Sequence, residues 1–385
     1  LESRGGTEAE FRKMVDRCRA AGVDVYADVV INHMQAQDAG VGFGGTPFGK
    51  RNHPGLFGPA DFHACGRNGN NWIQNFYDRW ELQNCDLLGL PDLATESPSV
   101  QEKLAGYITR LAEAGVAGVR MDAAKHVPGD DLAAILRKSH GMRYVMHELL
   151  INDERTVRFS EYERTGDVMV FPYSFDLASA IRNEKFGDFF RNLMGYPWSQ
   201  NAVVFVDNHD LERFRDRSNV LSVGDDGALY RLATVFMLAW PYGYPQIYSG
   251  YRFTSYDEGP PLLPSGHTAP ALNADASCRA PFTCFHRDPQ VKVALAFRNL
   301  AAGAFRAVHV GYDRSLVAFA RESSDGTVPS WAIFHFGSRE AQTRVPEGIP
   351  GGRWRDLLSG KTFSLHPGTP LRLPARSAHL FVRAE

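Results

Sequence analysis

The sequence predicts an α/β fold, a TIM-type (β/α)8 barrel with six of its strands in this chain, followed by a C-terminal antiparallel β-sandwich domain. First, an amphipathic helix, a glycine and an apolar strand recur in that order, which is typical of βα units. Second, these strands end in ionisable residues, as in barrels whose sites lie at the carboxyl ends of the strands. Third, helical periodicity disappears after residue 300 and alternating segments separated by turn residues replace it.

The first βα unit shows the pattern most clearly. Thr7 and Glu10 form a capping box, apolar residues recur at helical spacing, and Gly22 provides the stop before the strand VDVYADVV. The strands are expected to start near Val23, Val116, Arg143, Val168, Ala202 and Gln246. The helices are expected at residues 7–22, 97–115, 130–140, 175–186, 226–240 and 289–300.

A doubly wound sheet is the alternative, but no glycine-rich phosphate loop follows the first strand. Two further βα units would add roughly 60 residues at the usual barrel size of about 250. The opening LESRGGTEAEF lacks Met, so we expect this sequence to be the interior of a longer protein. Without the two missing strands the barrel would be open and would expose strand edges.

The predicted domains are a barrel, an insert and a β-domain. The stretch from residue 34 to residue 90 is rich in Gly, Asn, Pro and aromatic residues and is too long for an ordinary loop. The barrel then comprises 1–33 and 91–300, the insert 34–90, and the C-terminal β-sandwich 301–385.

Composition excludes several function classes. The 385 residues carry 42 basic and 44 acidic side chains, a net charge of −2, without a charge run, so neither nucleic acid nor an anionic membrane surface is an expected partner. No apolar run approaches the roughly 20 residues that span a bilayer. The five cysteines lack zinc-site spacing; a disulfide could close the short loop between Cys278 and Cys284, and free thiols are the alternative.

Four strand ends carry the chemistry: DVVINH (28–33), GVRMDAAKH (118–126), VMHEL (145–149) and FVDNHD (205–210). Three of them supply one carboxylate each, Asp122, Glu148 and Asp210. An Asp after a strand is often only a helix cap, but three carboxylates from three strands are most simply explained by convergence.

With LPDL (90–93) added, these motifs resemble those of the alpha-amylase family of glycoside hydrolases, in the same order, and most closely its animal-type branch with bacterial relatives. The resemblance implies endo-acting, retaining hydrolysis of α-1,4-glucosidic bonds in starch- or glycogen-type glucans by a secreted monomer. Related transglycosylases or maltose-forming enzymes share the motifs. A non-catalytic glucan-binding homologue would usually lose one of the three carboxylates.

Retention requires two carboxyl groups about 5 to 5.5 Å apart. The resemblance makes Asp122 the nucleophile, Glu148 the acid/base and Asp210 the residue that holds sugar hydroxyls and favours the distorted sugar. Arg120, two residues before Asp122, is expected to keep that carboxylate ionised. The apolar neighbours of Glu148 are expected to raise its pKa, as a general acid requires.

The resemblance implies substrate-binding roles for His33, Arg120, Lys125, His126 and His209. A buried, satisfied histidine and a solvated lysine are the simpler interpretations of these residue types. For Asp28, in the middle of a strand, the sequence predicts a buried structural partner for Arg120 or a nearby amide.

The resemblance also implies a calcium ion, held by the side chains of Asn32 and Asp92 and the backbone oxygens of Gln83 and His126, which would join barrel and insert. Asn32 as a turn amide and Asp92 as a cap are the alternatives. It implies the disulfides Cys65–Cys85 and Cys278–Cys284, with Cys18 left unpaired.

Chloride is not expected as a cofactor. The family's animal branch holds chloride with two basic residues and an Asn; Arg120 and Asn208 match two of these positions, but Gln246 stands at the third. A neutral amide does not replace the missing charge, and a buried anion with one cationic partner has less to offset its desolvation.

Overall fold

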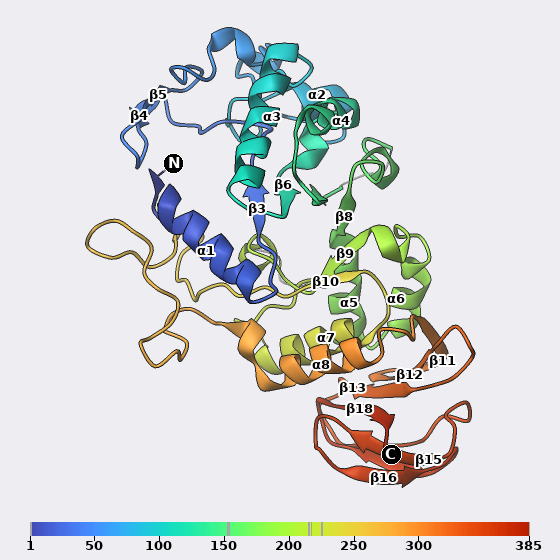
Figure 1. Ribbon diagram of the computed structural model, residues 1–385. Coiled ribbons are helices and arrows are strands. Elements are labelled where there is room, and N and C mark those ends of the chain that lie inside the picture. The colour runs from blue at the N-terminus through green and yellow to red at the C-terminus, as the bar shows by residue number, and fades with distance from the viewer. Residues whose placement is uncertain (1, 152–154, 215, 217, 225, 385) are drawn as a thin grey trace. The chain divides into compact units, whose positions relative to one another are not determined.

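A computed structural model describes residues 2–151, 155–214, 216, 218–224 and 226–384 (Figure 1). The chain divides into two compact units. The first unit comprises Leu1–Met169 and Pro261–Ala269, and the second comprises Val170–Pro260 and Pro270–Glu385.

Parallel strands form the centre of the first unit. They are β3 (Tyr26–Val29), β6 (Gly118–Met121), β7 (Tyr144–Leu149) and β8 (Asp167–Val170), in the order β3-β6-β7-β8. The pairings β3–β6 and β6–β7 are parallel, and their register sets Asp28 opposite Arg120 and Arg120 opposite Met146. This register brings the first two charged side chains together on neighbouring strands.

The main helices of the first unit are α1 (Glu8–Ala20), α3 (Pro98–Glu113) and α4 (Gly129–Lys138), all close to their predicted bounds. The capping box that begins α1 is present: Thr7 Oγ1 accepts from the backbone N–H of Glu10, whose carboxylate accepts from the backbone N–H of Thr7. Two orphan donors at the helix start are thereby satisfied.

The region predicted as an insert contains little regular structure. It holds the short strands β4 (Ala39–Val41) and β5 (Pro47–Gly49), the helix α2 (Arg79–Asn84) and 3-10 turns at Pro59–Asp61 and Arg67–Gly69. The predicted disulfide Cys65–Cys85 is confirmed, and Ile73 packs against it. The first unit also contains β1 (Glu2–Ser3), β2 (Gly6–Thr7) and 3-10 turns at Ala124–His126 and Phe159–Glu161.

The second unit contains the remaining two parallel strands, β9 (Ala202–Phe205) and β10 (Tyr244–Gln246), which pair with each other. Its helices are α5 (Phe171–Asn183), α6 (Phe186–Leu193), α7 (Gly227–Ala239) and α8 (Pro289–Leu300), with 3-10 turns at Ser199–Asn201, Leu211–Arg213 and Phe285–Arg287. The helices α7 and α8 lie side by side (Figure 1). The six predicted parallel strands are therefore all present.

One helix prediction was incomplete. Helix α5 begins at Phe171, earlier than expected, and the sequence analysis did not anticipate α6. Phe186 and Phe189 of α6 are buried, and they contact Phe236 of α7. Tertiary packing thus fixes a second helix in a segment that propensity alone left undivided.

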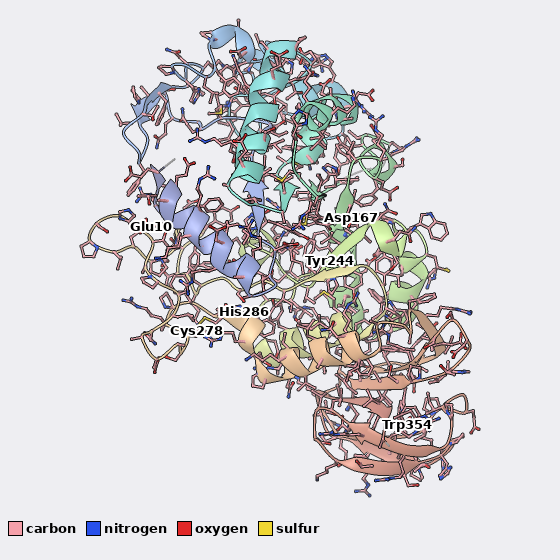
Figure 2. All side chains as sticks on the ribbon, in the orientation of Figure 1. Glu10, Asp167, Tyr244, Cys278, His286 and Trp354 are labelled. Carbon is pink, nitrogen blue, oxygen red and sulfur yellow. A yellow bond between two sulfur atoms is a disulfide. The ribbon has the colours of Figure 1, made fainter. Side chains whose placement is uncertain are left out.

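The C-terminal residues form an antiparallel β-domain, as predicted. One sheet has the order β11-β12-β13-β18-β15-β16, and β14 pairs with β17. Buried side chains between them include Trp331, Trp354 and Val345, and Figure 2 labels Trp354 in this domain. The strands are β11 (Arg306–Asp313), β12 (Leu316–Glu322), β13 (Ser330–His335), β14 (Ala341–Arg344), β15 (Gly352–Asp356), β16 (Thr362–Leu365), β17 (Pro370–Leu373) and β18 (Ser377–Arg383).

Candidate active site

One arginine organises the candidate site of the first unit. Arg120, near the end of β6, is buried, and its Nη1 lies 2.6 Å from Asp28 Oδ1 and 2.9 Å from Asp122 Oδ1. Its Nη2 lies 2.5 Å from Glu148 Oε1. Burial alone would lower the pKa of Arg120, but the charges of Glu148, Asp28 and Asp122 outweigh it and raise the pKa.

The prediction that Asp28 partners Arg120 is confirmed, but the prediction that Asp28 is buried was wrong. Its side chain is 54% exposed, whereas that of Arg120 is 8% exposed. The physical reason is its strand: β3 ends the strand order in the first unit, so no further strand covers it.

A short backbone turn holds Glu148 on its other side. Ala123 has φ +49°, in the left-handed region, and its N–H donates to Glu148 Oε2 at 2.8 Å. The side chains of Asp122 and Glu148, from neighbouring strands, are thus held by one guanidinium and one tight turn. Both contacts favour the ionised form of Glu148. They therefore oppose the effect that was expected from its apolar neighbours.

Basic side chains lie close to this pair. Burial lowers the pKa of Lys125 to about 8, although the charge of Glu148 opposes the shift, and Nζ donates to the backbone oxygen of Leu150 at 2.6 Å. Burial also lowers the pKa of His33, and the charge of Asp122 partly offsets this effect. Lys125 and His33 therefore share the electrostatic environment of the two carboxylates.

His126 is placed differently. Its ring is buried, and Nδ1 must donate to the backbone oxygen of Leu82, at 2.8 Å, because a carbonyl oxygen only accepts. Burial, with the charge of Lys125, lowers its pKa to about 3. This packing anchors the turn that follows β6 and favours a structural role for the ring.

The third carboxylate, Asp210, belongs to the second unit. It follows β9 by five residues and is the N-cap residue of the turn Leu211–Arg213. His209 Nε2 lies 3.7 Å from Asp210 Oδ2, and both side chains are about half exposed. Asn208 Oδ1 accepts the backbone N–H groups of Asp210 and Leu211 at 3.1 and 2.8 Å, which fixes the turn that carries Asp210.

The donors expected for calcium all lie in the first unit. The backbone N–H of Leu93 donates to the backbone oxygen of Asn32 at 2.9 Å, which places Asn32 beside the segment that carries Asp92. Burial raises the pKa of Asp92 to about 6, against the opposing effect of His63. Within the part of the chain that the structure describes, the buried Asp92 Oδ1 has no hydrogen-bond partner.

A buried carboxylate oxygen without a partner is the kind of ligand that a calcium ion would satisfy, so Asp92 fits the expected site. Gln83 and His126 lie on two adjoining segments, because Gln83 Nε2 donates to the backbone oxygen of Lys125 at 3.3 Å. No cluster of three or more His, Cys, Asp or Glu side chains suited to a metal occurs among the described residues. The expected donor set instead relies on an amide and backbone oxygens.

Sequence reasoning missed His63. Its Nδ1 donates to Asp92 Oδ2 at 2.6 Å, and its Nε2 to Glu96 Oε2 at 3.0 Å. Burial would lower the pKa of His63, but these two carboxylates raise it. Nothing in the sequence around His63 signals this role, since its partners lie about thirty residues away.

Comparisons with known proteins identify the family of this chain. Residues 1–293 match the family model described as the catalytic domain of alpha amylase. The chain belongs to the alpha-amylase family. The resemblance inferred from its motifs is therefore confirmed, and the family membership accounts for the order in which the four strand-end motifs occur.

Three relatives illustrate the similarity. The chain is 40% identical over 364 residues to an alpha-amylase of Streptomyces violaceus, covering 93% of this chain and 60% of that protein. It is 32% identical over 396 residues to pancreatic alpha-amylase of Sus scrofa, covering 94% of this chain and 76% of the relative. The crystal structure of alpha-amylase I from Eisenia fetida matches with TM-score 0.84 and 27% identity, covering 99% of this chain and 83% of that one.

The chain thus spans 60% of the length of the Streptomyces relative. A search of the described residues finds no helix long and apolar enough to cross a membrane. The second predicted disulfide, Cys278–Cys284, is present in the second unit, and Cys18 is a free cysteine.

Proposed function

We propose that this chain is the catalytic part of a secreted, endo-acting alpha-amylase that cleaves α-1,4-glucosidic bonds in starch- or glycogen-type glucans with retention. The observation that carries the proposal is the pair Asp122 and Glu148, two carboxylates from adjacent strands that contact the same guanidinium. Family membership supports the substrate class.

Asp122 acts as the nucleophile. Its carboxylate attacks the anomeric carbon, the bond to the leaving-group oxygen breaks, and Glu148 gives that oxygen a proton. Glu148 then removes a proton from water as the water attacks the anomeric carbon, and the bond to Asp122 breaks. The enzyme is restored and the configuration at the sugar is retained.

The first step needs a proton on one carboxyl group of the pair. Asp28, Asp122 and Glu148 face the single positive charge of Arg120. Glu148, with 11% of its side chain exposed against 21% for Asp122, is the less exposed of the two carboxylates, and we assign it the role of general acid.

Asp210 completes the set by accepting hydroxyl groups of the sugar and favouring its distorted, oxocarbenium-like form. His33, Arg120, Lys125 and His209 supply the donors around that sugar and the leaving-group side. His126 contributes its backbone oxygen to the expected calcium site, because Nδ1 of its ring donates to the backbone oxygen of Leu82.

Calcium would be held by Asn32, Asp92 and the backbone oxygens of Gln83 and His126. The ion would supply charge compensation for Asp92 and would tie segment 34–90 to the strands that carry the carboxylates. We take residues 1–33 and 91–300 as the barrel, 34–90 as the inserted domain and 301–385 as a β-sandwich domain, and the active protein as a monomer.

The test is substitution of each carboxylate in the enzyme with Asp122→Asn, Glu148→Gln and Asp210→Asn. Each should lower starch hydrolysis at least about a thousandfold, because the removed group acts in the transition state. Asp24→Asn, which removes a half-exposed carboxylate paired with Arg143, is the matched control and should retain activity. A catalytic variant that keeps more than about a tenth of wild-type activity contradicts its assigned role.

A further inference from the structure

Two cationic side chains of the second unit lie where its helices meet the β-domain. Arg321 of β12 is 4% exposed, and its Nε donates to the backbone oxygen of Ala304 at 2.8 Å. Arg298 of α8 donates through Nη1 to the backbone oxygen of Trp240 at 3.2 Å and through Nη2 to that of Gly243 at 2.7 Å. Each guanidinium is thus held by neutral carbonyl oxygens.

Side-chain packing brings the two arginines into the same layer. Phe319 precedes Arg321 by two residues on β12, so both side chains lie on the same face of the sheet. The ring centre of Phe319 lies 4.9 Å from that of Trp240. Trp240 is the C-cap residue of α7, and its backbone oxygen is the one that accepts from Arg298. The face of β12 that carries Arg321 therefore packs against the end of α7 that Arg298 holds.

The charges of these two arginines are not balanced by carboxylates. Among the residues that the structure describes, neither Arg321 nor Arg298 forms an ion pair with an acidic side chain. Burial and the charge of Arg298 lower the pKa of Arg321 to about 10, which leaves it protonated at neutral pH. Burial also lowers the pKa of Arg298. Because a buried charge without a partner of opposite sign is costly, this layer favours an added negative charge.

Two buried polar atoms in this layer lack partners. Arg321 stands opposite Ser330 in the antiparallel register of β12 and β13, so both side chains lie on the same face of the sheet. Ser330 is 1% exposed. Within the described ranges, the buried Arg321 Nη1 and the buried Ser330 Oγ have no hydrogen-bond partner. Since a guanidinium nitrogen only donates and a hydroxyl group can donate, both atoms can be satisfied by one acceptor that the protein does not supply.

The acceptor that suits this layer is a small monovalent anion. A water molecule would satisfy the two polar atoms but would leave both positive charges uncompensated. A divalent oxyanion such as sulfate carries twice the charge into a buried place, so it costs more to dehydrate. A halide ion is monovalent and accepts hydrogen bonds from any direction, which places no further demand on the geometry of the donors.

We propose that Arg321 Nη1 and Ser330 Oγ bind a buried halide ion, which also compensates the charge of Arg298 and stabilises the packing of the β-domain on α7 and α8. The site consists of other residues than the position at Gln246, and the ion takes no part in the proposed reaction. Its binding is therefore measured through stability rather than through activity.

The first test is the melting temperature of the enzyme in sodium bromide, with gluconate as the replacement anion at constant ionic strength. Because an ion that binds only the native state stabilises that state, the wild type should gain at least about 2 °C as bromide rises from zero to about 0.1 M. Arg321→Gln should lose more than half of this gain, and Ser330→Ala should need at least about fivefold more bromide for the same gain. The matched control Arg339→Gln removes an exposed positive charge from the same domain and should gain as the wild type does.

The second test is the anomalous scattering of bromide in crystals of the wild-type enzyme grown with sodium bromide. The signal should place an ion within about 3.5 Å of Arg321 Nη1 and of Ser330 Oγ. Anomalous density confined to other places, such as the surroundings of Asn208 and Gln246, overturns the proposal, and so does an ordered water at Arg321 without anomalous signal. A gain in melting temperature that Arg321→Gln retains in full also overturns it. If Arg321→Gln does not fold, Ser330→Ala and the crystals decide.

Discussion

Replacement of Arg120 by methionine tests how the two carboxylates of the first unit are held together. The substitution keeps a long apolar side chain but removes the charge that contacts Asp28, Asp122 and Glu148. Asp28 is mostly exposed, so its pair is worth no more than about 1 kcal/mol. Loss of one partner from a buried ion pair costs about 3 to 5 kcal/mol, because the other charge stays buried without compensation.

We therefore expect the Arg120→Met variant to lose about 3 to 5 kcal/mol of unfolding free energy at pH 7, measured by urea denaturation. Its loss should depend on pH with a definite sign. Without the cation, the native carboxylates bind protons more tightly than the unfolded chain does, so the stability of the variant falls as pH rises. The deficit relative to the wild type should shrink as pH is lowered from 8 to 5.

The matched control is Arg143→Met, which breaks an ion pair with Asp24 whose side chains are 66% and 49% exposed. It should change the unfolding free energy by less than about 1 kcal/mol at every pH. A loss for Arg120→Met no larger than that of the control, or a deficit that does not change with pH, would refute the claim that Arg120 neutralises a buried carboxylate pair.

Three further predictions address calcium, the leaving-group side and chloride. A chelator should lower the melting temperature of the wild type, because an ion bound only to the native state stabilises that state. The Asp92→Ala variant should show no such difference. An unchanged melting curve in metal-free wild-type protein excludes the site. Since burial lowers the pKa of Lys125 to about 8, its charge is lost as pH rises through that value, and kcat/KM on starch should fall there. Lys125→Arg should move this limb upward by more than one pH unit, and an unmoved limb assigns it to another group. Activity should not respond to chloride at constant ionic strength with acetate as replacement, whereas Gln246→Arg should create a response; saturable activation of the wild type would show that another cation completes the site.

The chloride prediction concerns two amide side chains of the second unit. Asn208 Nδ2 and Gln246 Oε1 are buried and have no hydrogen-bond partner in the described part of the chain. Gln246 carries no positive charge that could hold an anion, and the chloride titration tests the prediction.

Features that depend on short stretches of sequence were predictable. The capping box at Thr7 and Glu10, the six parallel strands and the start of α8 follow from local periodicity, capping and stop residues. The disulfide pairings and the order of the catalytic motifs came from the family resemblance, which the family match over residues 1–293 confirms.

Features that depend on contacts between distant residues were decided by the tertiary structure. The exposure of Asp28 follows from the place of β3 at the end of the strand order, and α6 exists because its phenylalanines are buried against α7. The raised pKa of His63 requires carboxylates that lie about thirty residues away in the chain.

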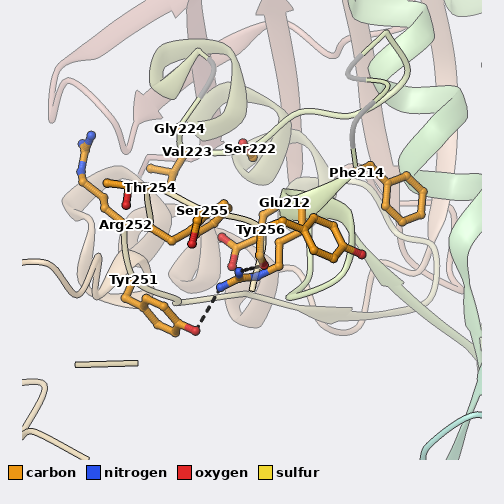
Figure 3. Close-up of a pocket in the computed structure, with 12 residues that line it drawn as sticks. Glu212, Phe214, Ser222, Val223, Gly224, Tyr251, Arg252, Thr254, Ser255 and Tyr256 are labelled. Atoms are coloured by element: carbon orange, nitrogen blue, oxygen red, sulfur yellow. Dashed lines mark hydrogen bonds between the residues drawn. The ribbon is translucent and has the colours of Figure 1, made fainter. Parts of the chain in front are cut away.

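The sequence by itself determined which residue types stand at the strand ends, because the apolar body and the polar end of a strand consist of consecutive residues. Only the tertiary structure decided which of those side chains share a partner: Asp122 and Glu148 meet at Arg120 because β6 and β7 pair in one particular register. A cavity of about 550 Å³ lined by Arg213 and Phe253 likewise arises from two segments about forty residues apart (Figure 3). A shared partner and a cavity are properties of packed surfaces, and packing depends on the whole fold.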